Sequence, residues 1–236
     1  MTSTLKLVKP ETLRAQVENH LRQAIVGGQL KAGQKLVERE LCEQMGVSRP
    51  SLREALRKLE AEKLIVNVPH RGPEVASMTL DEARNLYALR RLLEGHAAHE
   101  FARLASTNEI KNLGKVVKRL RAAGKRNSRE SVLLAKAEFY GVLLGGCGNP
   151  LIQEILGGLL SRISLLRATS LMLPDRLPKS LGEIDDLLKR IQDRDARGAQ
   201  EISYKHVLNA EVAALGIFEQ QIFNQQVQPT KEGKLA

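Results

Sequence analysis

Residues 47–60 of the chain read VSRPSLREALRKLE, a stretch with two chemically different faces. Arginine recurs at every fourth position, at Arg49, Arg53 and Arg57. On a helix these three side chains lie on one side, one turn apart. The apolar residues fall between them: Val47, Leu52, Ala55, Leu56 and Leu59. This spacing predicts a helix that packs through its apolar face and presents guanidinium groups on the other.

The residues around this stretch predict the remaining parts of a winged helix-turn-helix. Apolar residues recur at helical spacing over 11–27, and 37–45 reads as a second short helix that ends at Gly46. Ser48 is a favourable N-cap for the third helix, which we expect over 48–63. Between the first two helices, GGQLKAGQKL indicates a turn-rich connector. After the third, LIVNVPHRGPEV combines β-branched residues with a Pro/Gly turn and indicates a small hairpin.

The composition favours a helical protein with a polyanionic partner. Aromatic residues make up 3% of the chain and Trp is absent, so the core must consist of Leu, Ile, Val and Ala. The net charge of +10 fits nucleic acid, although solubility alone is the alternative explanation. Cys42 and Cys147 suggest no disulfide framework, and no signal peptide or membrane-spanning run is evident. We therefore expect a cytoplasmic protein without a membrane partner.

From Thr79 onward the sequence shows only helical periods, which predict a helical bundle. The expected helices are 79–104, 107–124, 131–146, 150–168, 179–192 and 195–222. The predicted fold class is therefore mostly α. A winged helix-turn-helix domain spans 10–77, an antiparallel all-helical bundle spans 79–222, and a disordered tail spans 223–236.

Polar residues of the first domain point to DNA. A helix anchored by its apolar face, with arginines in its N-terminal half, suits the major groove, where guanidinium forks bind guanine or phosphate. Its N-terminus also presents free N–H groups to a phosphate. The expected DNA-binding residues are Arg39, Ser48, Arg49, Arg53, His70, Arg71 and Gly72. The alternative is an ordinary solvated face, which Glu54 and Glu60 would favour.

Residues 12–76 resemble the N-terminal domain of the GntR family of bacterial transcription regulators. The resemblance is carried by LKAGQKLVERELCEQMGVSRPSLREALRKLEAEKLI and by the HRG that follows. It implies that Arg39, Arg49 and Arg53 contact DNA and that residues 70–72 form the wing tip. Arg57 has weaker support and is expected to be a surface charge.

Residues 79–222 resemble the all-helical FCD effector domain of FadR-type members of this family. The carriers are LYALRRLLEGHAA, AEFYGVLLGGCGNPLI and RDARGAQEISYKHV, and the six expected helices resemble the shorter VanR-type variant. The resemblance implies a homodimer, with contacts that include LYALRRLLE, and a pseudo-palindromic operator. It also implies a small effector, usually a carboxylate, that relieves repression.

Many members of this group hold a divalent metal ion with one Asp and three His, and the present sequence departs from that pattern. The Asp position is Lys136, the first His position is Tyr140 and the next is Ile184, so only His206 matches. An ammonium beside a lone imidazole is a poor metal site, and no metal cofactor is expected. His96, His99 and Glu100 read as an ordinary helix surface.

We expect an effector site in which the Lys136 ammonium replaces the charge of the metal. The expected effector-binding residues are Lys136, Tyr140, His206, Arg90 and Arg162, with Arg167 as a further candidate cation. The alternative is a filled, ligand-free core in which Lys136 reaches solvent or pairs with an acid such as Glu138.

No motif of an enzyme is evident. The sequence has no Gly-rich loop followed by Lys-Ser/Thr, no Gly-x-Ser-x-Gly elbow and no Cys/His dyad with obvious spacing. Two other interpretations remain: a dimeric DNA-binding regulator without an effector, and a small-molecule-binding or enzymatic helical protein whose basic head is incidental.

Overall fold

The computed structural model of the chain describes residues 12–126 and 128–227. The chain divides between Ser77 and Met78 into two compact units. Residues 10 and 11 of the expected first domain and residues 228–236 of the expected tail lie outside the described residues.

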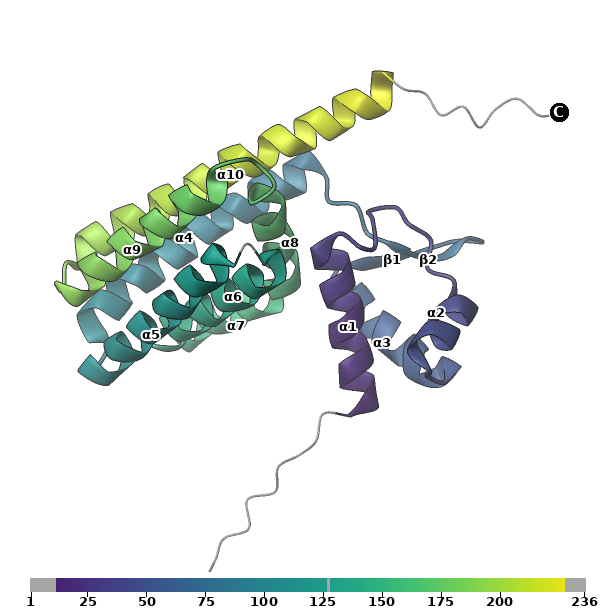
Figure 1. Ribbon diagram of the computed structural model, residues 1–236, viewed down its shortest axis with the longest axis horizontal. Helices are drawn as coiled ribbons and strands as arrows, with labels where there is room; N and C mark the ends of the chain where they lie inside the picture. The colour runs from purple at the N-terminus through teal and green to yellow at the C-terminus, as the bar shows by residue number, and fades with distance from the viewer. Residues whose placement is uncertain (1–11, 127, 228–236) are drawn as a thin grey trace, which may run out of the picture. The chain divides into compact units, whose positions relative to one another are not determined.

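The described residues of the first unit form three helices followed by a hairpin (Figure 1). These elements are α1 (Leu13–Gly27), α2 (Glu38–Met45), α3 (Arg49–Ala61), β1 (Ile65–Val68) and β2 (Gly72–Val75). The two strands pair antiparallel, with Ile65 opposite Val75 and Val68 opposite Gly72. The elements of a winged helix-turn-helix thus occur in the predicted order.

The local sequence explains where the helices of this unit begin and end. Gly46 ends α2 in a left-handed conformation with φ of 64°, which glycine adopts at little cost. Ser48 begins α3, where its Oγ accepts a hydrogen bond from the N–H of Ser51 at 3.4 Å. The residues of α3 predicted to face inward are buried in one core with α1 and β1: Leu52, Ala55, Leu56 and Leu59. This core holds the opposite face of α3 toward solvent.

The connector between α1 and α2 adds to the sheet, which the sequence did not predict. The N–H of Leu36 donates to the Pro73 carbonyl at 2.8 Å, and the N–H of Val75 donates to the Gln34 carbonyl at 2.9 Å. An isolated bridge joins Lys35 to Glu74. An extended segment this short has no detectable period in the sequence. Its pairing partners also lie far along the chain, so local patterns do not indicate them.

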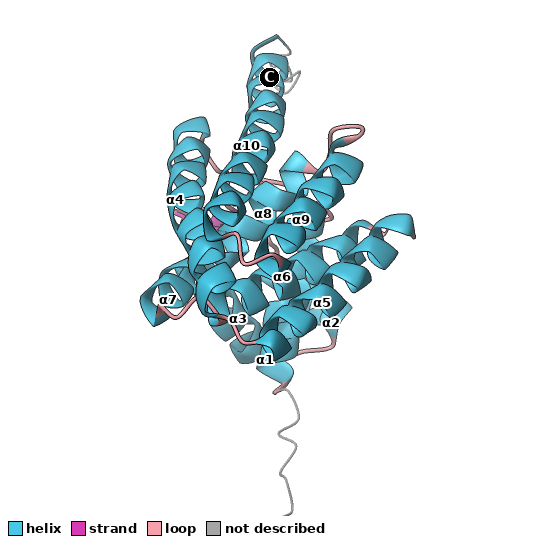
Figure 2. Cartoon of the chain, turned by 90° about the vertical axis from the view of Figure 1, so that its left-hand side faces the viewer, coloured by secondary structure: helices cyan, strands magenta, loops and turns pink. Residues whose placement is uncertain are grey.

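The described residues of the second unit form a helical bundle without strands (Figure 2). Its helices are α4 (Leu80–Leu104), α5 (Thr107–Lys125), α6 (Arg129–Gly145), α7 (Pro150–Gly158), α8 (Leu160–Ser170), α9 (Arg176–Gln192) and α10 (Ala196–Val227). Thr79 caps α4 through a capping box with Glu82, as its sequence predicts. The long helices α4 and α10 lie side by side. None of the described helices is both long and apolar enough to cross a membrane.

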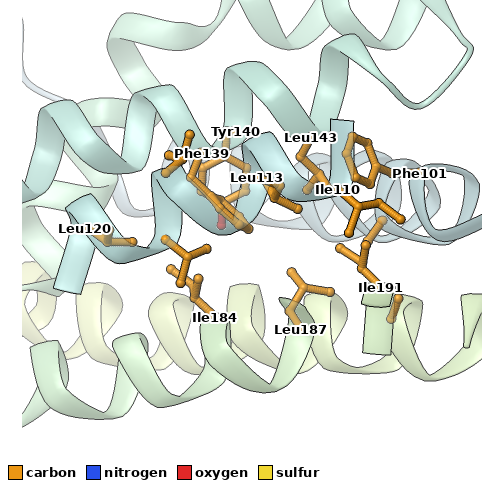
Figure 3. Packing of buried hydrophobic residues seen from close by; sticks show 14 of the residues in the cluster. Phe101, Ile110, Leu113, Leu120, Phe139, Tyr140, Leu143, Ile184, Leu187 and Ile191 are labelled. Carbon is orange, nitrogen blue, oxygen red and sulfur yellow. The ribbon is translucent and has the colours of Figure 1, made fainter. Parts of the chain in front are cut away.

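Three helices of this unit meet over an apolar core (Figure 3). Residues three or four positions apart on α5, α6 and α9 face one another across it, as expected for amphipathic helices. They include Ile110, Leu113, Leu120, Phe139, Leu143, Ile184, Leu187 and Ile191.

Two predictions for this unit are wrong. The helix expected over 150–168 is divided at Leu159, where glycines at 157 and 158 weaken helix propensity, so the described residues form seven helices rather than six. The VanR-type variant was expected because of six helices, so the observed helix count no longer supports it. The second error concerns the tail expected from 223, since α10 continues to Val227.

Candidate functional site

The first candidate surface lies at the N-terminal half of α3. Arg49 is exposed and forms no ion pair with any described residue. The Nε of Arg53 donates to Glu38 Oε2 at 2.9 Å. Because Glu38 lies in the first turn of α2, this contact ties together the two helices and sets the direction of the Arg53 guanidinium. Arg57 is 74% exposed and pairs with Glu54 on its own helix.

Arg39 is the second residue of α2, and Ser48 is the N-cap of α3. Both are exposed, and Arg39 forms no ion pair within the described part of the chain. Ser48 caps α3, whose first N–H groups lie beside the exposed arginines. The N-terminus of α3 therefore presents donors that suit a phosphate group.

The wing tip, residues 70–72, lies at the turn between β1 and β2. His70 has a left-handed φ of 64°, and Gly72 has a φ of 85°. The turn is closed by the N–H of Arg71, which donates to the Val68 carbonyl at 3.0 Å. The exposed Arg71 guanidinium is paired with Glu74, 3.1 Å from its Nε. This turn fixes a projecting basic tip at the end of the hairpin.

The second candidate is a set of charged side chains inside the helical unit, which we call the charge cluster. Its members are Arg90 and Glu94 of α4, Lys136 of α6, Arg167 of α8, and Arg176 and Glu183 of α9. All except the partly buried Glu183 are no more than 6% exposed. Such residues are rarely buried unless they are paired.

Glu94 holds two arginines in this cluster. Nε of Arg90 donates to Glu94 Oε1 at 2.8 Å, and Nη2 of Arg167 donates to the same oxygen at 3.3 Å. The Arg167 guanidinium also lies over the Tyr140 ring, 3.7 Å from its centroid. Burial raises the pKa of Glu94, but Arg90 and Arg167 outweigh it, so that the pKa lies below its usual range. Glu94 is therefore the counter-charge of both guanidinium groups.

Glu183 accepts hydrogen bonds from two other side chains, Arg176 and His206. Nη2 of Arg176 donates to Glu183 Oε2 at 2.8 Å, and Nδ1 of His206 lies 2.5 Å from the same oxygen. Because a carboxylate only accepts, the imidazole donates its Nδ1 proton here. Burial lowers the pKa of His206 to about 4, although the hydrogen bond to Glu183 acts in the other direction. His206 is thus neutral near pH 7.

Lys136 has a neutral partner. Its Nζ donates to the Ser180 hydroxyl at 2.6 Å, within the buried interior. Glu138 pairs instead with Arg119 on α5. The alternative in which Lys136 pairs with Glu138 is therefore wrong, because the two side chains leave α6 on different faces.

The surroundings of Lys136 are expected to make the stability of the chain rise with pH. The charged and titratable groups that interact with it are Arg90 on α4, Arg167 on α8, Arg176 and Glu183 on α9, and His206 on α10. Burial, followed by repulsion from Arg167, Arg176 and Arg90, lowers the pKa of Lys136 from 10.5 to about 7. The unfolded chain then binds this proton more tightly than the folded chain between those values, so raising the pH favours folding.

Thermal unfolding at pH 7 and pH 9 measures this effect. We expect the free energy of unfolding to rise by on the order of 2 kcal/mol between them, since each unit of pKa difference is worth about 1.4 kcal/mol. The corresponding rise in Tm is on the order of 5 °C. Lys136→Met is expected to lack the rise, and an equal pH dependence in both proteins would contradict the assignment.

The residues that the resemblance places at metal positions make other contacts in the structure. Lys136, expected at the position of an Asp ligand, donates to Ser180. Ile184 packs in the apolar core with Leu187 (Figure 3). His206 is the remaining imidazole, and no group of three or more His, Cys, Asp or Glu side chains that could share a metal occurs among the described residues.

The structure brings together most, but not all, of the expected effector residues. Arg90, Lys136 and Arg167 belong to the charge cluster, which Tyr140 and His206 contact. Arg162 lies apart from these contacts, since its Nη2 is 3.4 Å from Glu82 Oε1 at the start of α4. The cluster residues that sequence reasoning did not include are Glu94, Arg176 and Glu183, and it also did not include Ser180, the partner of Lys136.

Comparisons with known proteins agree with this two-part organisation. The profile described as bacterial regulatory proteins, gntR family, matches residues 13–75, and the FCD domain profile matches residues 85–209. The chain belongs to the GntR family of regulators with an FCD domain. This GntR-family chain is therefore a transcriptional regulator with a DNA-binding helix-turn-helix.

Two relatives and one solved structure are similar to the chain. An uncharacterised HTH-type regulator, YdhC of Bacillus subtilis, is 24% identical over 204 residues, covering 86% of this chain and 89% of YdhC. The gluconate operon transcriptional repressor of the same organism is 26% identical over 61% of this chain and 59% of its own length. The structure of Escherichia coli McbR matches with a TM-score of 0.73 and 21% identity, over 90% of this chain and all of McbR. These relatives are named as regulators rather than enzymes.

Proposed function

We propose that the chain is a repressor that binds a pseudo-palindromic operator as a homodimer and responds to a small anionic effector. The observation that supports the DNA-reading part is the exposed Arg49 beside the capped start of α3. Buried leucines hold the opposite face of this helix, so the arginine face is presented on a rigid element. Such a helix enters the major groove in helix-turn-helix proteins.

Each DNA-binding residue has a separate role in this proposal. Arg49 and Arg53 reach base edges or phosphates in the major groove. Arg39 and the N-terminus of α3 at Ser48 hold the backbone. The wing tip, which consists of His70, Arg71 and Gly72, lies at the neighbouring minor groove, where an arginine can sense groove width.

The homodimer is proposed to form through α4 and α10. Exposed apolar side chains occur on both helices, which pack side by side: Leu92, Tyr204, Leu208 and Val212. Leu92 belongs to the LYALRRLLE segment expected at the dimer contact. An apolar stripe of this kind suits burial against a second copy of the chain.

Val212→Glu is expected to convert the dimer to a monomer. Val212 is 68% exposed, so the substitution would leave the single subunit folded while placing a charge inside the dimer contact. Loss of the second DNA-reading head would lower operator affinity by about a hundredfold or more. Sedimentation velocity and operator titration measure both effects.

Leu151→Glu on α7 is the matched control, because Leu151 is 64% exposed but lies outside α4 and α10. It is expected to remain dimeric. A dimer in both variants would refute this contact.

The effector part of the proposal is supported by the charge cluster. A ligand that binds one arrangement of the bundle more tightly than another changes operator affinity by that difference. Release of the operator on ligand binding is the expected direction. A thermal-shift screen of small acids tests this part. If the chain binds the operator but no acid in the screen shifts its Tm, the alternative of a regulator without an effector would be favoured.

Operator titration at increasing salt concentration tests the DNA-reading part. If the dimer neutralises six or more phosphates, affinity is expected to fall by roughly a thousandfold between 50 and 200 mM salt. The same titration with unrelated duplexes gives the sequence preference. Weak, salt-insensitive binding without preference would favour the interpretation in which the basic head is incidental.

A further inference from the structure

The charge cluster carries more positive than negative charge. Its cations are Arg90, Lys136, Arg167 and Arg176, and its anions are Glu94 and Glu183. Each carboxylate already accepts from arginine, and Lys136 donates to a neutral hydroxyl. When Lys136 is protonated, four cations therefore share two carboxylates among the described residues. The excess of two positive charges is unfavourable in a buried environment.

Three guanidinium groups of the cluster also keep N–H donors that meet no acceptor. Nη1 of Arg90, Nε and Nη1 of Arg167, and Nε of Arg176 are buried without a hydrogen-bond partner among residues 12–126 and 128–227. Buried donors in folded proteins are nearly always paired. All three arginines repel the Lys136 ammonium and so lower its pKa. Both the charge and the donors are therefore suited to an anion with several acceptor oxygens.

Arg167 is the arginine of the cluster whose positive charge is compensated least. Burial lowers the pKa of Arg167, and Glu94 at 3.3 Å does not restore it. Arg167 also has two unpaired nitrogens, and its other side is covered by the Tyr140 ring. The unpaired Nε and Nη1 lie on different edges of the planar guanidinium, so each can donate to a separate acceptor oxygen of an anion.

We propose that the charge cluster binds a small organic dianion directly, without a divalent metal ion. Two negative charges balance the excess, whereas a monoanion leaves one positive charge uncompensated. The residues at the metal positions favour direct binding, because the Lys136 ammonium repels a metal cation. This inference rests on the proposed function, in which the ligand is the effector.

The test uses the full chain, treated with EDTA and dialysed, in thermal-shift and calorimetric titrations at pH 6.5, where Lys136, whose pKa is lowered to about 7, is mostly protonated. The probes are malonate and succinate, with acetate as the monoanion at matched ionic strength. We expect at least one of the dianions to raise the Tm and acetate to have little effect. Lys136→Met and Arg167→Met are expected to weaken binding of that dianion tenfold to a hundredfold, as for loss of a charge-assisted hydrogen bond. Lys179→Met, an exposed lysine on α9, is the matched control and is expected to bind as the wild type does.

Three results would overturn the inference: equal effects of acetate and all dianions, a response that appears only when a divalent metal ion is restored, or unchanged binding by both cluster variants. Lys136→Met is expected to fold at least as stably as the wild type, because it removes an excess cation. Operator binding is measured separately on the same preparations. A chain that does not bind the operator would contradict the proposed function. The outcome of the dianion titration does not depend on operator binding.

Discussion

Replacing Arg49 with alanine is expected to lower operator affinity by about tenfold to a hundredfold without unfolding the chain. A bidentate contact from arginine to a base is worth about 1–3 kcal/mol. Arg49 is the first residue of α3, is exposed and has no ion-pair partner among the described residues, so its removal leaves no buried group unpaired. Fluorescence anisotropy with a labelled operator measures the affinity, and thermal unfolding checks the fold.

Arg57→Ala is the control on the same helix. Arg57 lies two turns beyond Arg49 and pairs with the exposed Glu54, which fits a surface charge. Its replacement is expected to change affinity by about twofold at most, because exposed pairs contribute little. Equal losses for both variants would show that α3 attracts DNA by net charge alone. No loss for Arg49→Ala would contradict its assigned role.

Glu94→Gln is expected to be strongly destabilising. Glu94 is the shared counter-charge of Arg90 and Arg167, and all three side chains are buried. Removing one partner from a buried ion pair costs about 3–5 kcal/mol, because the remaining charge is uncompensated. For a chain of this size the Tm would fall by about 10 °C. Calorimetry or circular dichroism at pH 7.5 measures the change.

Two comparison variants separate charge balance from simple loss of a contact. Glu138→Gln removes an exposed carboxylate that pairs with Arg119, and it is expected to change stability by less than about 1 kcal/mol. Arg167→Met removes a cation from the same cluster as Glu94 and is expected to keep the Tm at or above that of the wild type. A large loss of stability in Arg167→Met would contradict the positive excess.

Local signals in the sequence accounted for the first unit and for most helix boundaries. Ser48, Gly46 and Thr79 act at helix ends through hydrogen bonds to residues within a few positions, so their effects can be predicted from the sequence. The apolar residues of α3 repeat at helical spacing and pack as predicted. The short pairing of Lys35 with Glu74 could not be predicted in this way, because it depends on the fold of the whole unit.

The buried charge cluster was only partly predictable for a related reason. Lys136 stood out because it replaces an expected ligand, but its partner Ser180 is on another helix. Arg176 follows a turn that the sequence indicated only as a break, and its side chain returns to the interior from there. One signal was available for Glu94: it lies four residues after Arg90, on the same face of α4 as the buried Tyr87 and Ala98. A charged pair within a buried stripe indicates an internal ionic site.

Selection of bound sequences from a random duplex pool tests most directly whether this chain reads DNA as a two-headed protein. With the wild-type chain we expect enrichment of an inverted repeat whose half-sites are separated by about one helical turn. Arg49→Ala is expected to lose the enrichment at defined positions of each half-site. A pool that shows no enriched sequence after repeated rounds, or a single half-site without symmetry, would contradict the account.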